Sequence, residues 1–435
     1  MPGVKLAILG GVPTSRGPWP SWPRAEDTTE KAVIEVLNSG HWSVSGPPTK
    51  EKPRESIFAE SFAQFHCVPY CVPTSSGSAA LTVALESLGV GAGMEVLVPA
   101  LTWVACGSAV ARVGAVPVLV DVDPQTLCMS LEAARAALTP ATAAIMLVHL
   151  YCTIADLRRF TELARTSGVP LLEDCSHAHG ATWKGKRVGT FGSVGVFSMQ
   201  QSKVLTCGEG GAVITASQEL FDRLQQFRAD GRRYVESHPD GGHGLENVGD
   251  FQGHNYVLSE FQAAILADRL KRLDEENALR LDNAAHLTNL ILTQTPFRPL
   301  HDPSTDGQPT FYRYVIRCAP ELLRAVPVDL VAKALEGELS LAVQPIYDPL
   351  CNNVLLDPRR SPQCPKSPSA QELYNPRRFA APNAVAARAE CVAIPHNALL
   401  GGKDRMRAIL DALMKVIDNQ AELSRVAMTT EGHGT

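Results

Sequence analysis

Hydrophobic residues between position 56 and about position 214 fall into short continuous runs separated by segments with helical spacing. The helical segments include residues 78–88 and 154–167. The apolar runs cover residues 95–98, 116–120, 143–150, 170–173, 194–198 and 211–214. Unbroken runs of this length are typical of strands that helices bury on both faces. The pattern therefore predicts an α/β fold with a largely parallel central sheet.

The pattern changes on both sides of this region. The first fifty residues are rich in proline, which removes backbone donors and fixes φ, so they predict an extended arm with one helix at about 26–38. We expect Trp19 and Trp22 of this arm to pack on the body of the protein or on a partner subunit. A long helical pattern at 259–293 precedes a smaller α+β domain, in which we expect strands at 312–316 and 340–346 and helices at 327–335 and 404–418.

These patterns predict four parts of the chain. Residues 1–40 form the arm and its helix, 41–265 a large domain, 266–426 a small C-terminal domain and 427–435 a disordered tail. Within them we expect a mobile loop at 230–250, where glycine, histidine and aspartate are frequent, and a loop at 348–380, which contains six prolines.

The composition of the chain limits the kinds of molecule that we expect it to bind. The chain has 40 basic and 45 acidic residues, so its net charge of −5 predicts no binding to nucleic acid or to an anionic membrane. No apolar run approaches the roughly 20 residues of a membrane span. The eleven cysteines are odd in number and scattered, which does not suit a secreted disulfide framework. We expect a reduced cytoplasmic protein that acts on small molecules.

The stretch from 170 to 214 carries the strongest chemical signal. Asp174 follows one apolar run and Lys203 follows another, and ligands of parallel sheets bind where the carboxyl ends of strands meet. An amine that forms an imine and a carboxylate that pairs with a pyridinium nitrogen are the two groups that pyridoxal phosphate enzymes require. A desolvated pocket would lower the pKa of the lysine and supply its neutral form.

Other motifs in this stretch are weaker. Gly180 to Lys186 has the spacing of a phosphate-binding loop, but Arg187 stands where serine or threonine would bind magnesium, so we expect a surface hairpin. His177 and His179 could flank a metal with Asp174, although histidines two residues apart more often serve hydrogen bonding. We predict no metal site. A nucleophile elbow of the α/β-hydrolase type does not occur.

Several motifs together resemble those of a known family. They are Gly40-His-Trp42, Ser76-Gly-Ser-Ala-Ala-Leu81, Pro99-Ala-Leu-Thr-Trp103, Glu173-Asp-Cys-Ser-His-Ala-His-Gly-Ala181, Lys203-Val-Leu-Thr-Cys-Gly-Glu-Gly-Gly211 and Gly253-His-Asn-Tyr-Val-Leu-Ser-Glu260. They resemble the DegT/StrS sugar aminotransferases, which are fold type I pyridoxal phosphate enzymes, along nearly the whole chain. The resemblance implies a seven-stranded, mostly parallel sheet in the large, cofactor-binding domain.

The resemblance also implies roles for individual residues. Lys203 would bind pyridoxal 5′-phosphate covalently, Asp174 would pair with the pyridine nitrogen, and His177 would lie near the phenolic oxygen. Trp103 would stack on the ring. The phosphate would be held by Ser78, the Ala79 amide, Ser198 and, from the second subunit of a homodimer, Asn255. Helix N-termini bind anions, which agrees with Ser78 opening a helix. The alternatives are structural: Trp103 as core, Ser198 as a buried hydroxyl, His177 as a structural histidine and Asn255 as a turn residue.

Two further stretches resemble one subgroup of that family. Residues 199–203 and 394–401 are similar to enzymes that transfer nitrogen from L-glutamine to scyllo-inosose or 2-deoxy-scyllo-inosose in aminocyclitol and aminoglycoside antibiotic biosynthesis. Cys67 and Cys152 stand where the family commonly has glycine, and we expect Cys152 to border the acceptor pocket. The alternatives are a keto-sugar acceptor, free, nucleotide-linked or aminoglycoside-bound, or a regulatory protein that binds the cofactor without catalysis. Arg228, Arg232 and Arg233 would favour a nucleotide if they faced the entrance.

Overall fold

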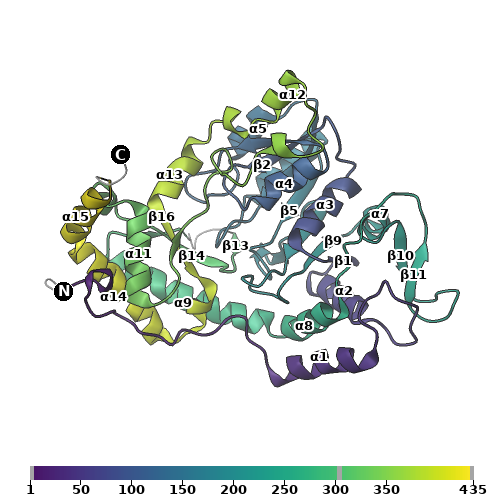
Figure 1. Ribbon diagram of the computed structural model, residues 1–435, viewed down its shortest axis with the longest axis horizontal. Helices are drawn as coiled ribbons and strands as arrows, with labels where there is room; N and C mark the ends of the chain where they lie inside the picture. Colours follow the sequence, from purple (N-terminus) through teal and green to yellow (C-terminus); the bar gives the residue numbers. More distant parts are fainter. Residues whose placement is uncertain (1–3, 301–305, 432–435) are drawn as a thin grey trace.

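A seven-stranded sheet forms the centre of the large domain in the computed structural model, which describes residues 4–300 and 306–431 (Figure 1). Its strands, in spatial order, are β1 (Tyr70–Thr74), β9 (Gly211–Thr215), β8 (Val194–Ser198), β5 (Leu171–Asp174), β4 (Thr142–Val148), β2 (Glu95–Pro99) and β3 (Val116–Val120). Only β9 runs antiparallel to its neighbours. This sheet confirms the predicted α/β fold.

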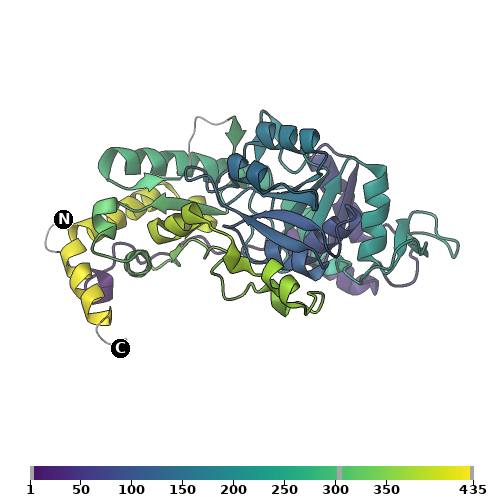
Figure 2. The ribbon, with the colours of Figure 1, turned by 90° about the horizontal axis from the view of Figure 1, so that it is seen from above.

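Helices lie on both sides of this sheet (Figure 2). They are α2 (Arg54–Phe65), α3 (Gly77–Ser87), α4 (Ala105–Arg112), α5 (Leu131–Ala137), α6 (Leu157–Ser167), α7 (Gln218–Arg228) and α8 (Glu260–Leu270). Because the helices cover both faces, strands such as β3 and β9 are buried at every position. This double burial explains why the strands appear in the sequence as unbroken apolar runs.

A second, four-stranded sheet lies at the other end of the molecule (Figure 1). Its order is β12 (Arg298–Pro299), β14 (Arg313–Arg317), β16 (Cys391–Pro395) and β15 (Gln344–Pro345). Around it lie α9 (Leu273–Gln294), α10 (Pro320–Leu323), α11 (Val328–Leu339), α13 (Pro382–Glu390) and α14 (Lys403–Asp418). The long helical pattern is thus two helices, α8 and α9, interrupted at residues 271–272. The predicted strand at 340–346 shortens to β15.

The connecting segments are more ordered than the sequence suggests. The expected mobile loop contains a hairpin of β10 (Arg232–Val235) and β11 (Gly244–Asn247), and the phosphate-loop-like stretch folds into the expected hairpin, β6 (Thr182–Trp183) and β7 (Lys186–Arg187). β13 (Gly307–Gln308) pairs with β6. The proline-rich loop carries η2 (Pro358–Arg360), α12 (Pro368–Leu373) and η3 (Pro376–Arg378), and η4 (His396–Leu400) follows β16.

The C-terminal segment differs from its prediction. Helix α15 (Gln420–Glu431) extends through residues 427–431, which were expected to be disordered. The side chains of Leu423 and Ala427 are buried, so the helix has an apolar face that stabilises it. Residues 432–435 lie outside the described part of the chain. The predicted domain boundaries themselves remain predictions.

The N-terminal arm packs on the body of the protein, which is one of the two outcomes expected for its tryptophans. It begins with η1 (Ala7–Leu9) beside α11 and runs along the small domain to α1 (Asp27–Ser39), which packs against α8 (Figure 1). The Trp19 indole donates a hydrogen bond to the Leu339 carbonyl at 2.6 Å. The Trp22 indole donates to the carbonyl of Lys203 at 3.1 Å. In the described ranges, no helix combines the length and the apolar character needed to cross a membrane.

Candidate active site

A cavity of about 410 Å³ opens where the carboxyl ends of β4, β5 and β8 meet the first turn of α3. Six of the predicted site residues line it together, although they come from distant parts of the sequence: Ser78, Trp103, Asp174, His177, Ser198 and Lys203. Other side chains on its wall were not predicted, namely Ser76, Leu81, Thr102, Cys106, Val148, Ser176, Gln200, Ser202, Glu209, Tyr312 and Tyr347.

Asp174 is the last residue of β5 and is held by two hydrogen bonds. Its Oδ1 accepts from the Ser176 amide at 2.9 Å, and its Oδ2 accepts from the Cys106 thiol at 3.2 Å. Burial, followed by the charge of Asp174, raises the pKa of Cys106 well above its usual value, so the thiol stays protonated and can donate. Sequence reasoning missed Cys106. It lies three residues after Trp103, about one helical turn, and this spacing could have placed both on one side of the cavity.

Glu173 precedes Asp174 but serves a structural purpose. Its carboxylate oxygens accept hydrogen bonds from the backbone amides of Gly189, Phe191 and Gly192 at 2.6–2.8 Å. His149 Nδ1 accepts from the Ala155 amide, so in the neutral ring Nε2 carries the proton and donates to Glu173 at 3.3 Å.

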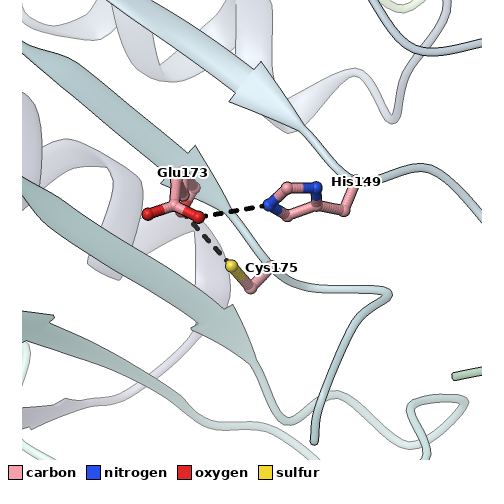
Figure 3. Close-up of side chains that lie close together, drawn as sticks. All are labelled: His149, Glu173 and Cys175. Atoms are coloured by element: carbon pink, nitrogen blue, oxygen red, sulfur yellow. Dashed lines mark hydrogen bonds and ion pairs between the residues drawn. The ribbon is translucent and has the colours of Figure 1, made fainter. Parts of the chain in front are cut away.

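His149, Glu173 and Cys175 form a buried cluster whose possible metal-ligand atoms lie within 4.8 Å of one another (Figure 3). Because hydrogen bonds already engage both oxygens of Glu173, we interpret the cluster as an anchor for the end of β5 rather than as a metal site.

Lys203 has the environment that an imine-forming lysine requires. Its side chain is only 7% exposed, and burial lowers the pKa of its ammonium group. Its Nζ lies 4.1 Å from the centre of the Tyr312 ring. A lower pKa increases the fraction of neutral amine, which is the nucleophilic form. The structure therefore supports the predicted chemistry at this position.

His177 is held as a neutral ring. Burial lowers its pKa well below the usual value, and the charge of Lys203 acts in the same direction. Its Nδ1 accepts a hydrogen bond from the Tyr151 amide at 3.1 Å, which leaves the proton on Nε2. The ring stacks on Tyr312, with 4.0 Å between the ring centres. His177 can therefore donate one hydrogen bond to an oxygen of a bound ligand.

Tyr312 is a further functional residue that the sequence analysis did not identify as such. Although burial acts to raise its pKa, the positive charges of Lys203 and Arg313 and a hydrogen bond with Ser202 lower it to about 8. Its hydroxyl lies 2.9 Å from Ser202 Oγ, which lies 2.7 Å from Gln200 Oε1. This chain of polar groups joins the small domain to the loop that carries Lys203.

The first turn of α3 and Ser198 form a small polar cradle. Helix N-termini leave backbone amides free and carry a partial positive charge, which suits a phosphate group. A Cβ atom at Gly77 would lie 2.5 Å from the Cβ atom of Ser198, so the glycine permits the helix to approach β8 closely. The Ala79 amide donates to Ser76 Oγ at 3.1 Å, and its contact with a phosphate stays a prediction.

The groups in this cavity fit pyridoxal phosphate. A buried lysine, a carboxylate at a strand end, a neutral histidine and a helix N-terminus match the aldehyde, the pyridinium nitrogen, the phenolic oxygen and the phosphate, respectively. Trp103 is 50% exposed at the cavity wall and presents an open aromatic surface to a planar ring.

Some residues lie away from the cavity. Asn255 is exposed and does not line the cavity of its own chain. Arg228 forms a buried ion pair with Glu55, and Arg233 pairs with Glu246 on the hairpin; neither lines the cavity of its own chain. Arg232 bonds to the carbonyl of Ala229.

The prediction for Cys152 is wrong, because this residue is buried near Cys128 and Cys391 and does not line the cavity. The preceding residue, Tyr151, has a φ of +57°, which redirects the chain after β4. The side chain of Tyr151, rather than that of Cys152, then lies beside His177 and Tyr347.

The fold and this set of groups define a pyridoxal phosphate-dependent aminotransferase of fold type I. A family model described as the DegT/DnrJ/EryC1/StrS aminotransferase family matches residues 23–409. The chain belongs to this family, as its motifs predict.

Relatives and solved structures agree with this assignment. The chain is 45% identical to an L-glutamine:2-deoxy-scyllo-inosose aminotransferase of Streptomyces kanamyceticus, over 97% of this chain and 98% of the relative. It is 43% identical to an L-glutamine:scyllo-inosose aminotransferase of Streptomyces griseus, over 97% and 99%. The crystal structure of 3-amino-5-hydroxybenzoic acid synthase superposes with a TM-score of 0.77 at 30% identity, covering 92% of this chain and 98% of that one.

Proposed function

We propose that this enzyme moves the amino group of L-glutamine to the ketone of scyllo-inosose or 2-deoxy-scyllo-inosose, a step of aminocyclitol antibiotic biosynthesis. The observation that carries this proposal is the full-length similarity, at 43–45% identity, to relatives named for these two reactions. The complete set of catalytic groups around Lys203 supports turnover rather than cofactor binding alone.

The roles of the residues follow from their positions. Bound pyridoxal phosphate supplies an electron sink that stabilises negative charge at the substrate Cα. Lys203 would hold the cofactor covalently, and its neutral amine would take a proton from the substrate Cα. Asp174 would keep the pyridine nitrogen protonated, and the hydrogen bonds from Cys106 and Ser176 fix the orientation of the Asp174 carboxylate. His177 would donate its Nε2–H to the phenolic oxygen.

The polarity of the cavity favours a cyclitol over a nucleotide-linked sugar. Gln200, Ser176, Ser202 and Glu209 offer hydrogen-bonding groups to the hydroxyls of a polyol. Among the described residues of this chain, Lys203 is the only cationic side chain on the cavity wall. A nucleotide diphosphate would require arginine or lysine partners for its phosphates.

An acceptor panel tests this proposal. The enzyme, first converted by L-glutamine to its pyridoxamine form, is mixed with scyllo-inosose, 2-deoxy-scyllo-inosose or a nucleotide-linked keto-sugar. We expect either cyclitol to restore the absorbance of the aldehyde form, and the Lys203→Ala variant to show no turnover. Restoration by the keto-sugar alone would contradict the proposed acceptor.

We also propose a cytoplasmic homodimer in which Asn255 binds the phosphate in the partner's site. The exposure of Asn255, away from the cavity of its own chain, supports this arrangement. All eleven cysteines lie in the described part of the chain and are free thiols, which suits a reducing compartment.

Mixed dimers test the sharing of sites. Lys203→Ala and Asn255→Ala chains, refolded together, would form some dimers in which one site carries neither substitution. We therefore expect activity in the mixture above the sum of the two separate variants. If the mixture shows only that sum, Asn255 acts within its own chain or not at all.

A further inference from the structure

Trp22 contacts the backbone of the catalytic lysine and does not line the cavity. Its indole N–H donates to the backbone carbonyl of Lys203 at 3.1 Å. The indole ring lies over two buried guanidinium groups, with 4.6 Å to Arg269 and 5.2 Å to Arg280, measured from Cζ to the ring centre. Glu276 accepts from both arginines. The indole is therefore held firmly by charged groups that are themselves paired.

His396 of the small domain holds the neighbouring peptide. Its Nε2 donates to the carbonyl of Ser202 at 3.2 Å, and its ring meets Trp22 edge to face with 4.5 Å between ring centres. Burial lowers the pKa of His396 well below its usual value, so the ring is neutral and has one proton to donate. Two consecutive carbonyls, of Ser202 and Lys203, are thus fixed by side chains from other parts of the chain.

Other contacts of the N-terminal arm attach the segment around Trp22 to the small domain. The Asn397 side chain donates to the Pro20 carbonyl at 2.7 Å, and the Trp19 indole bonds to Leu339. The arm is therefore attached to the small domain on one side and to the loop of Lys203 on the other. Neither Trp22 nor His396 lines the cavity, so a role in the reaction would have to pass through the backbone of the Lys203 loop.

We propose that Trp22 is a positioning residue for the reaction: with His396, it fixes the backbone of Lys203 so that the lysine amine meets the cofactor aldehyde in a productive geometry. This inference rests on the proposed role of Lys203. Misplacement of a reacting group by about 1 Å can lower a rate by as much as roughly 100-fold, so a backbone hydrogen bond behind the nucleophile is sufficient to affect chemistry.

Trp22→Phe and Trp19→Phe form a matched pair for the test. Each variant keeps an aromatic ring in the same arm and loses one indole hydrogen bond to a backbone carbonyl, but only Trp22 bonds to Lys203. Covalent attachment of pyridoxal phosphate to the apoenzyme is followed by borohydride trapping and peptide mass spectrometry. Thermal unfolding, kcat and KM for L-glutamine are measured on the holoenzymes.

We expect the two variants to lose similar thermal stability. We expect only Trp22→Phe to lower the attachment rate and kcat, by about tenfold, with KM for glutamine nearly unchanged. Equal attachment rates in the two variants would overturn the inference. If Trp22→Phe does not fold, His396→Gln, which keeps a donor, should retain the rate that His396→Leu loses, and equal rates in that pair would also overturn it. If the wild-type enzyme is not trapped at Lys203, the proposed site itself is wrong.

Discussion

Gly77 offers the sharpest test of the phosphate cradle. The Cβ atom of an alanine there would lie 2.5 Å from Ser198 Cβ and 2.8 Å from Ser198 Oγ, whereas ordinary contacts begin at 3.4 Å. The start of α3 and the end of β8 would therefore have to separate by about 1 Å. Overpacking of this kind costs roughly 1–3 kcal/mol. If this free energy is lost from the binding of the phosphate group, the affinity for pyridoxal phosphate should fall about 5- to 150-fold.

The assay is a titration of apoenzyme with pyridoxal phosphate, monitored by absorbance, for Gly77→Ala and for a control. Gly91→Ala is a suitable control, because a Cβ atom at Gly91 would meet nothing within 4 Å and its φ is not positive. We expect the control to bind as the wild type does. If Gly77→Ala binds pyridoxal phosphate as tightly as the control, the close approach of α3 to Ser198 is not required, and the proposed cradle is refuted.

Three further predictions concern stability and pH. Cys67 has a φ of +56°, so Cys67→Gly should raise the free energy of unfolding by up to about 1 kcal/mol in urea denaturation, and a lower midpoint would contradict this. Burial lowers the pKa of His66 from 6.5 to about 4, so the free energy of unfolding should decrease as the pH drops from 6.5 to 4. In His66→Phe this decrease should be smaller by about 3 kcal/mol. If the decrease is unchanged in His66→Phe, His66 is not its source. Tyr312 has a pKa of about 8, and the negative charge of its phenolate would favour the ammonium form of Lys203. The rate of the glutamine half-reaction should therefore fall above pH 8 in the wild type. If the rate falls in the same way in Tyr312→Phe, Tyr312 is not the cause.

The sequence predicts the parts of the site that depend on the sheet alone. Asp174 and Lys203 were expected together because each follows an apolar strand, and parallel strands end at one edge. Ser78 was implied by the family resemblance, and its position at the start of a predicted helix agreed with that role. These inferences need only the order of strands and helices, which hydrophobic periodicity indicates well.

Residues that depend on packing between distant segments could not be predicted in this way. Tyr312 and Tyr347 reach the cavity only because the small domain docks against the large one. The direction of Cys152 depends on the left-handed conformation of Tyr151, which the residue type does not indicate. Arg228 is a surface-type residue by sequence, but its buried partner Glu55 lies 173 positions away.

Glu173 and Asp174, the two neighbouring acidic residues of β5, differ in their surroundings because they point to opposite faces of the strand. Successive side chains of a strand point to opposite faces, so Glu173 meets the amides behind the sheet while Asp174 meets the cavity. Inserting or deleting one apolar residue before Glu173 would exchange the faces to which the two carboxylates point, although the net charge of the strand would not change. Over evolution, β5 should therefore accept many apolar replacements but no change in length.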